Sequence, residues 1–83
     1  MTGRRESIKN RLNEVFREVF DRADIEIFED MTAKDIEEWD SLMHVVLVVA
    51  VEKEFGIRLN AAEVGKLENV GQMLTILEAR AVK

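Results

Sequence analysis

The stretch EEWDSLMHVVLVVAVEKEFG, residues 37–56, decides the fold of this chain. It contains seven consecutive apolar residues, Val45 to Val51, and five of the seven are valine. Valine favours strands, so propensity alone predicts a buried β-strand here. The run continues, however, through charged residues without a turn signal and stops at Gly56, a residue type favoured just beyond a helix end. No second long apolar segment could pair with a strand. We therefore predict a helix over residues 42–55.

This predicted helix has two apolar faces. One face packs into the core and consists of three residues spaced four apart: Leu47, Val51 and Phe55. Leu42, Val46 and Val49 project to the opposite side, where a surface helix usually carries polar residues. Core and docking roles both stay open for these three residues. Because a small chain cannot easily bury one helix on every side, we favour a docking patch.

A second amphipathic helix is predicted near the start of the chain, over residues 4–21. Its apolar residues recur at helical spacing: Ile8, Leu12, Val15, Phe16, Val19 and Phe20. The following connection, residues 22–40, is long for so small a protein, and long connections are often functional. Three of its apolar residues are expected to attach it to the core: Ile25, Ile27 and Phe28. Thr32 and Asp35 have capping-box spacing, which predicts one short helical turn.

Two further helices are predicted after Gly56. Asn60 and Glu63 have capping-box spacing and indicate a brief helix near residues 61–65. Asn69 and Gln72 repeat this spacing before a final helix. The inner face of that helix is predicted to consist of Val70, Met73, Leu74, Leu77 and Ala81. The predicted fold class is all-α: a single domain over residues 1–83, built as a small four-helix bundle with three longer helices, one short third helix and a long first loop.

The composition of the 83 residues points away from catalysis and metal binding. There is no cysteine, and the single histidine, His44, cannot form a metal site alone. Ser41 and His44 are three residues apart, but no third orienting group is evident for a catalytic triad. Phosphate-loop and metal-ligand motifs are missing from the sequence. We expect no enzymatic activity.

The net charge of −5 is unevenly distributed. Residues 1–20 carry a net charge of +2, residues 21–40 carry −7, and residues 41–83 carry 0. An acidic segment that leads to Ser41 disfavours nucleic acid and favours a basic partner surface, although such runs are also common as solvated loops. The sequence has neither a signal peptide nor an apolar run long enough to insert into a membrane. We expect a cytoplasmic protein.

At Asp40-Ser41-Leu42 the sequence resembles the acyl carrier protein family. The tripeptide opens a helix that ends in EKEFGIRL, and the resemblance extends over nearly the whole chain. It implies that 4′-phosphopantetheine from coenzyme A is attached to Ser41 by a phosphopantetheinyl transferase. From the residues alone, Ser41 or Asp40 could simply cap the helix. The resemblance further implies a monomer that meets acyl-loading and acyl-processing enzymes with basic docking surfaces one at a time.

The residues expected to dock these partners surround Ser41 and follow it along the helix. They are Asp40, Leu42, Met43, Val46, Val49 and Lys53. Housekeeping fatty-acid carriers commonly have a glycine shortly before the motif, where this chain has Glu38 and Trp39. Those carriers also have acidic residues where this chain has Met43 and Val46, and another near Lys53. These differences suggest a specialised carrier for a secondary-metabolite, polyketide, modified-lipid or aminoacyl pathway.

Two other functions remain open at this point. An aminoacyl or peptidyl carrier would use the same arm on Ser41 and differ only in its cargo. An unmodified helical interaction module would bind a partner helix through Leu42, Val46 and Val49. The aminoacyl carrier is distinguished from the acyl carrier by the enzyme that loads the holo-protein. The interaction module is distinguished from both carriers by whether Ser41 accepts the arm. For Trp39 we expect a partly buried anchor of the loop, and for His44 a position at the rim of the core.

Overall fold

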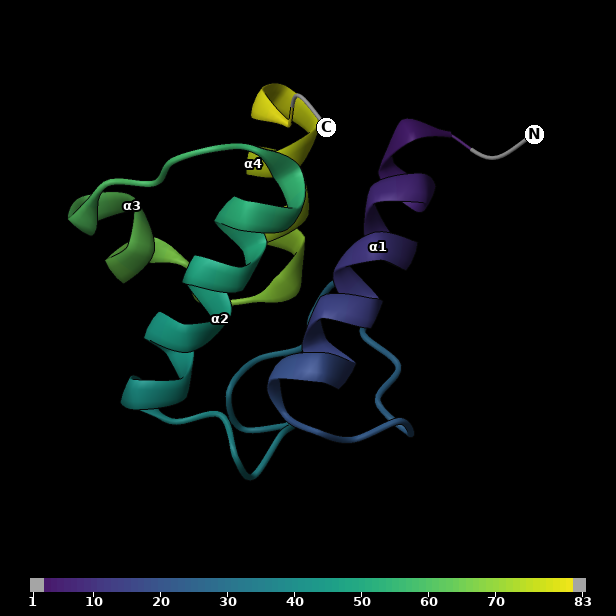
Figure 1. Ribbon diagram of the computed structural model, residues 1–83, viewed down its shortest axis with the longest axis vertical. Helices are drawn as coiled ribbons and strands as arrows, with labels where there is room; N and C mark the ends of the chain where they lie inside the picture. Colours follow the sequence, from purple (N-terminus) through teal and green to yellow (C-terminus); the bar gives the residue numbers. More distant parts are fainter. Residues whose placement is uncertain (1–2, 82–83) are drawn as a thin grey trace.

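Four α-helices follow one another along residues 3–81, the part of the chain that the computed structural model describes (Figure 1). Their bounds are α1, Arg4–Val19; α2, Ser41–Phe55; α3, Ala61–Lys66; and α4, Val70–Arg80. Within this range there is no β-strand, so the helical interpretation of the valine run is confirmed. None of the helices described here is long and apolar enough to cross a membrane.

The end of each helix follows from local chemistry. Gly56 ends α2 in the left-handed conformation, with φ of 65°, and its N–H donates to the carbonyl of Glu52. Helix α1 ends at Val19, two residues earlier than predicted, because Asp21 adopts a positive φ of 52°. The predicted capping box of α3 is confirmed: Asn60 and Glu63 each accept a hydrogen bond from the other's backbone N–H, at 2.8 and 3.1 Å.

The second predicted capping box forms only by half. Asn69 caps α4 as expected, because its side-chain oxygen accepts from the N–H of Gln72 at 2.9 Å. The Gln72 side chain does not return this bond to Asn69; its Oε1 accepts instead from the N–H of Glu68 at 2.6 Å. Helix α4 therefore begins at Val70, and Glu68, the residue before the cap, is also held in place.

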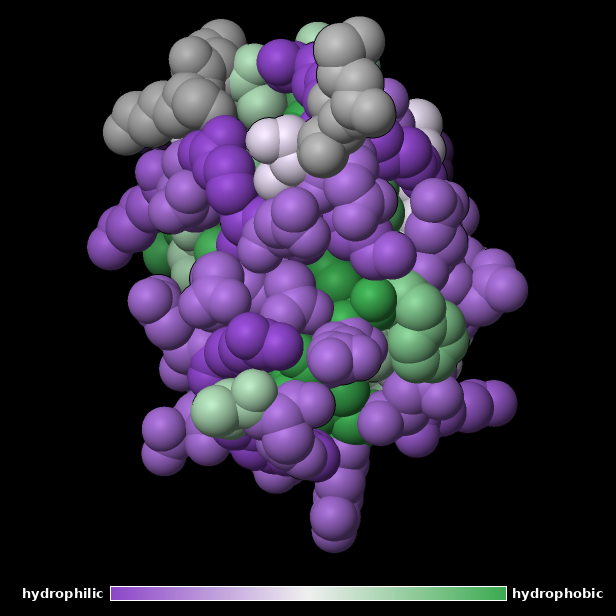
Figure 2. Space-filling model, turned by 90° about the vertical axis from the view of Figure 1, so that its right-hand side faces the viewer, coloured by the Kyte–Doolittle hydropathy of each residue, from purple (hydrophilic) through white to green (hydrophobic). Residues whose placement is uncertain are grey.

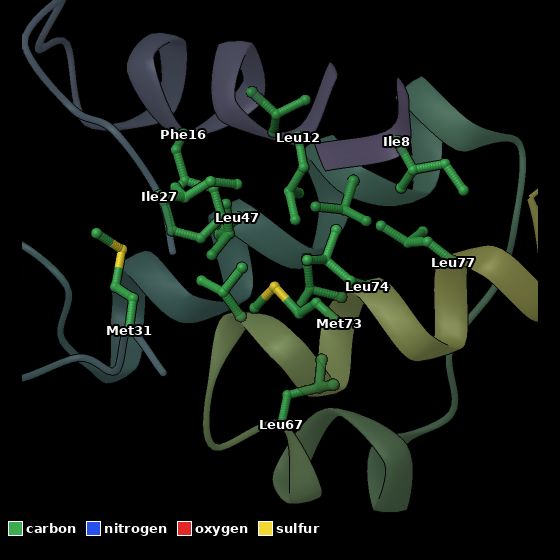
Figure 3. Close-up of a cluster of buried hydrophobic side chains, with 14 of the residues drawn as sticks. Ile8, Leu12, Phe16, Ile27, Met31, Leu47, Leu67, Met73, Leu74 and Leu77 are labelled. Atoms are coloured by element: carbon green, nitrogen blue, oxygen red, sulfur yellow. The ribbon is translucent and has the colours of Figure 1, made fainter. Parts of the chain in front are cut away.

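The core lies between α1, α2 and α4, and Figure 3 shows side chains from these helices pointing into it. The predicted inner faces are confirmed. Leu12, Phe16, Leu47, Phe55 and Leu74 are fully buried, and Leu77 is nearly so. Val19 and Ala81 are half-buried at its edge. Helix α2 lies at the front of Figure 1, with no helix in front of it, whereas the side on which α1 lies is mostly hydrophilic in Figure 2.

The long loop between α1 and α2 is held at both sides of the bundle. Asn13 of α1 donates to the carbonyl of Ile25 and accepts from the N–H of Ile27, at 3.2 and 2.7 Å. On the other side, the first N–H groups of α4 donate to loop carbonyls: Val70 to Met31 at 3.0 Å and Gly71 to Glu29 at 2.8 Å. These bonds satisfy backbone groups that a helix start otherwise leaves free.

Two expectations for this loop were wrong. Phe28 does not attach the loop to the core, because its side chain is 45% exposed, while Ile25 and Ile27 are buried. Thr32 and Asp35 form a hydrogen-bonded turn but no helical segment. The N–H of Thr32 donates to Asp35 at 2.9 Å, and the Thr32 hydroxyl accepts from Lys34, which closes the turn locally.

Candidate functional site

The start of α2 separates the capping residue from the candidate attachment residue. Asp40 has an extended backbone, and its Oδ1 accepts from the N–H of Met43 at 2.9 Å, so Asp40 is the N-cap. Ser41 is the first helical residue and is exposed. Its hydroxyl has no hydrogen-bond partner among residues 3–81. Of the two residues that could cap the helix, Asp40 does so, and the Ser41 hydroxyl stays available.

The backbone around Ser41 suits an anionic group. The N–H groups of Ser41 and Leu42 precede the first intrahelical bonds and have no acceptor among the described residues. Free N–H groups and the positive end of the helix dipole favour a phosphate at this position. The carboxylate of the cap, Asp40, accepts from the N–H of Met43 through one oxygen and leaves the N–H groups of Ser41 and Leu42 unoccupied.

Trp39, the residue before the cap, is connected to α2 and α3 by way of His44. Its side chain is only 5% exposed and packs edge-on against Phe16, with ring centroids 5.4 Å apart. Its indole Nε1–H donates to Nδ1 of His44 at 3.1 Å. Because Nδ1 accepts, the imidazole proton lies on Nε2, which donates to the backbone carbonyl of Val64 at 3.2 Å. Both ring nitrogens are thereby occupied, so His44 is not free to act as a base for Ser41.

A hollow of about 430 Å³ lies beside Ser41, between the loop, α2 and α3. Its wall includes His44 and Val64, together with two small residues, Ala33 and Gly65. An added Cβ at Gly65 would have no atom within 4 Å, which shows that this part of the wall is open. The prediction for His44 is confirmed, since it is half-buried at the rim. Trp39 lies in the core as a loop anchor but is buried, and not partly buried as predicted.

The outer face of α2 is apolar and open to solvent. Leu42 is 73% exposed, and the exposed fractions of Val46 and Val49 are 43% and 44%. The question that the sequence left open, core or surface, is therefore answered: all three are at the surface. Lys53 is exposed in the last turn of the same helix. Met43, by contrast, is half-buried and packs against the core, so it adds little to this face.

The sequence interpretation missed one residue of this face. Val45 is 56% exposed, more than Val46 or Val49. Helical spacing could have found it, because Val45 lies three residues after Leu42 and four before Val49. We call Leu42, Val45, Val46 and Val49 the α2 stripe.

Ion pairs join parts of the long loop to one another and to α1. In the acidic loop, Arg22 bonds to Asp24 and to Glu38, at 3.0 and 3.2 Å. The hydrogen bond from Arg22 holds the pKa of the Asp24 carboxyl below its usual value. Arg5 of α1 likewise lowers the pKa of Glu29 in the loop, to which it donates two hydrogen bonds. Among the described residues, no cluster of three potential metal ligands is found.

Comparison with known proteins agrees with this geometry. Residues 10–77 match the family described as the phosphopantetheine attachment site. The solution structure of holo acyl carrier protein from Geobacter metallireducens is 35% identical and superposes with a TM-score of 0.81. This match covers 87% of the present chain and 83% of the Geobacter chain. Comparison with curated proteins gave no match.

The chain therefore belongs to the acyl carrier protein family. It is a carrier to which 4′-phosphopantetheine is attached covalently, and not a catalyst. The residues at the start of α2 fit such a group, because an exposed hydroxyl, two free N–H groups and an adjoining hollow meet there. A carrier of this type interacts with a phosphopantetheinyl transferase and with acyl-processing enzymes.

Proposed function

We propose that Ser41 carries the arm, and that the protein presents acyl intermediates on it as thioesters. The observation that carries this proposal is the division of roles at the start of α2. Asp40 caps the helix, which leaves the Ser41 hydroxyl exposed and without a hydrogen bond among residues 3–81. In the transfer, the Ser41 oxygen gives up its proton and bonds to the pantetheine-bearing phosphorus of coenzyme A, while the diphosphate P–O bond breaks and adenosine 3′,5′-bisphosphate leaves. The free N–H groups of Ser41 and Leu42 favour the negative charge of the phosphodiester at this helix start.

The arm supplies a terminal thiol, which this cysteine-free chain cannot provide itself. The protein's own residues contribute position and recognition. The hollow beside Ser41 offers room close to the attachment point, and the bridge from Trp39 through His44 to Val64 keeps its walls together. We propose that residues 1–83 act as one carrier domain in the cytoplasm.

Partner docking is proposed for the outer side of α2. Asp40, Leu42, Val46, Val49 and Lys53 are exposed and support this role, and Val45 joins them. Met43 is retained only as a minor contributor, since it is half-buried. The acidic loop, with its net charge of −7 over residues 21–40, favours partners with basic docking surfaces.

We further propose a specialised lipid or polyketide pathway. Met43 and Val46 occupy positions at which housekeeping carriers are commonly acidic, and a third such position lies near Lys53. A partner that recognises acidic side chains on this helix would therefore lose its main contacts. A housekeeping ketosynthase should bind this protein much more weakly than a housekeeping carrier, and equal affinity in a titration would contradict the specialisation.

The attachment site is tested by digestion after modification. The protein is incubated with coenzyme A, magnesium and a broad-specificity phosphopantetheinyl transferase, and is then cut with trypsin. The mass of one phosphopantetheine should be found on the peptide between Lys34 and Lys53, which contains Ser41. The modified protein is then offered to acyl-activating and aminoacyl-activating enzymes. Loading by an acyl-activating enzyme alone supports the acyl cargo, and loading by an aminoacyl-activating enzyme alone overturns it.

A further inference from the structure

The α2 stripe lies between two regions of opposite charge. Its four side chains are between 43% and 73% exposed and lie on successive turns of one helix. Near its first residue, Leu42, lies the acidic end of the long loop. Near its last residue, Val49, lie Lys53 and Arg58, which line the same hollow as Val49. The two ends of the stripe thus differ in charge, although the stripe itself is uncharged.

The acidic end carries two carboxylates that can meet a partner, and Asp40 does so through its second oxygen, because its Oδ1 already accepts from the N–H of Met43. Glu37 and Asp40 are exposed, and neither forms an ion pair within 4.0 Å in the part of the chain that is described. The neighbouring Glu38 differs, because it already bonds to Arg22 at 3.2 Å. We call Glu37 and Asp40 the acidic pole.

The basic end of the stripe also carries exposed charges that can meet a partner. Lys53 and Arg58 are exposed, and residues 3–81 provide neither of them with an ion-pair partner. The two nearest carboxylates along the chain are already engaged. Glu52 accepts from the N–H of Leu59 at 2.7 Å, and Glu54 pairs with Arg11 at 2.9 Å. Lys53 and Arg58, which we call the basic pole, line a hollow of about 510 Å³ at the end of the stripe.

The two poles are too far apart to neutralise each other. From Leu42 to Lys53 the helix rises about 16 Å, at 1.5 Å per residue. The screening length at physiological salt is about 8 Å, so charges at this separation are largely independent in solution. A partner that covers the stripe therefore meets a negative field at one end and a positive field at the other.

We propose that the α2 stripe docks a protein surface with an apolar centre, basic side chains facing the acidic pole, and a carboxylate facing the basic pole. The proposal rests on the carrier function and specifies the partner of that same site. The carboxylate is the new element, because a uniformly basic partner would place a cation against Lys53 and Arg58. The arrangement also sets the orientation of the partner along α2, since the reversed orientation places like charges together at both ends. A membrane surface is disfavoured, because anionic headgroups would meet the acidic loop.

The probes for this proposal are three helical peptides of equal length, stapled to hold the helix, with the same leucine stripe. One has carboxylates at one end and ammonium groups at the other, one has ammonium groups at both ends, and one has carboxylates at both ends. Each is titrated into the ¹⁵N-labelled full chain, and the dissociation constant is taken from shifts of α2 amides. We expect the peptide with opposite ends to bind roughly fivefold to tenfold more tightly than the other two.

Charge reversal makes the test specific. In Lys53→Glu/Arg58→Glu the preference should move to the peptide with ammonium groups at both ends. The control, Lys9→Glu/Lys66→Glu, makes the same change in net charge away from the stripe and should keep the original preference. Three results would each overturn the proposal. They are equal dissociation constants for all three peptides, amide shifts located outside α2, and an unchanged peptide preference in the double charge reversal. Sedimentation with phosphatidylserine-containing vesicles would overturn it as well.

The same variants distinguish this proposal from the carrier assignment. Each is incubated with coenzyme A and the phosphopantetheinyl transferase, and the mass gain is measured. Normal modification of Ser41 without any charge preference among the peptides overturns the docking proposal alone. A charge preference without modification of Ser41 overturns the attachment site alone.

Discussion

The indole of Trp39 donates a hydrogen bond to Nδ1 of His44 at 3.1 Å, and the planes of the two rings are nearly parallel, at an angle of 15°. Trp39 closes the long loop, His44 belongs to α2, and Nε2 of His44 reaches the carbonyl of Val64 in α3. One side chain therefore joins three segments that surround Ser41. The bond from Trp39 to His44 joins residues five apart in the sequence, whereas the bond from His44 to Val64 joins residues twenty apart.

Replacing His44 should show how much the hydrogen bonds from Trp39 through His44 to Val64 contribute to the free energy of unfolding. In His44→Ala the buried indole N–H loses its acceptor, which costs about 1–3 kcal/mol of unfolding free energy. The change is measured by urea denaturation followed by fluorescence, since Trp39 is the only tryptophan.

The control for this bridge is the same substitution in a Trp39→Phe background, monitored by circular dichroism. Phenylalanine has no N–H that needs an acceptor, so His44→Ala should cost clearly less there. An equal cost in both backgrounds would show that the hydrogen bond contributes nothing measurable.

Two adjacent valines provide a matched pair for the two faces of α2. Val48 is 6% exposed and Val49 is 44% exposed, although they are neighbours in one helix. Val48→Ala should lower the unfolding free energy by about 1.5–3 kcal/mol, through lost burial and a cavity. Val49→Ala should change it by no more than about 0.5 kcal/mol. Both values come from thermal or urea denaturation, and similar losses for the two variants would place Val49 in the core.

Two helical glycines should respond in opposite directions to alanine. A Cβ at Gly65 meets nothing within 4 Å, so Gly65→Ala should stabilise the protein by up to about 1 kcal/mol. A Cβ at Gly71 would lie 3.1 Å from the carbonyl oxygen of Glu29, to which the Gly71 N–H donates. Gly71→Ala should therefore displace the Glu29 carbonyl, weaken its hydrogen bond with α4 and lower the melting temperature. An unchanged or higher melting temperature for Gly71→Ala in calorimetry would contradict the close approach of loop and helix.

Acid should weaken the contact between α3 and α4. Hydrogen bonds from Arg80 and from the N–H of Asn60 hold the pKa of Glu63 below its usual value of 4.5. In the unfolded chain the carboxyl regains its usual pKa. Its contribution to stability is thus complete above about pH 4.5 and is lost as the pH falls through the lower folded value.

The variant Glu63→Gln removes this titration. It should be less stable than the parent near neutral pH, and the difference should shrink as the pH falls below about 4.5. Glu6→Gln is the control, because Glu6 is exposed and has no ion pair among residues 3–81. Urea midpoints measured across the pH range check the effect. The prediction is refuted if the stability difference between Glu63→Gln and the parent stays constant down to acidic pH.

The sequence predicted those features that local chemistry controls. The number and type of helices, the Asn60 capping box and the inner faces of α1, α2 and α4 all follow from spacing and capping residues. Ser41 was singled out by its motif, but the motif alone could not say whether Ser41 or Asp40 caps the helix. That assignment depends on where the Asp40 side chain bonds.

Tertiary contacts determine the features that the sequence did not predict. The bond between Trp39 and His44, and its extension to Val64, depends on how the loop and α3 pack, which no spacing in the sequence reveals. The exposure of Phe28 likewise reflects how the loop lies on the bundle. Val45 is different, because helical spacing already placed it beside Leu42 and Val49.

The most direct test of the central claim is the intact mass of three proteins after incubation with coenzyme A, magnesium and a phosphopantetheinyl transferase. They are the parent, Ser41→Ala and Ser7→Ala, which together cover both serines of the chain. We predict a gain of one phosphopantetheine unit in the parent and in Ser7→Ala, and no gain in Ser41→Ala. A gain in a folded Ser41→Ala, or no gain in the folded parent, would contradict the attachment of the arm at Ser41.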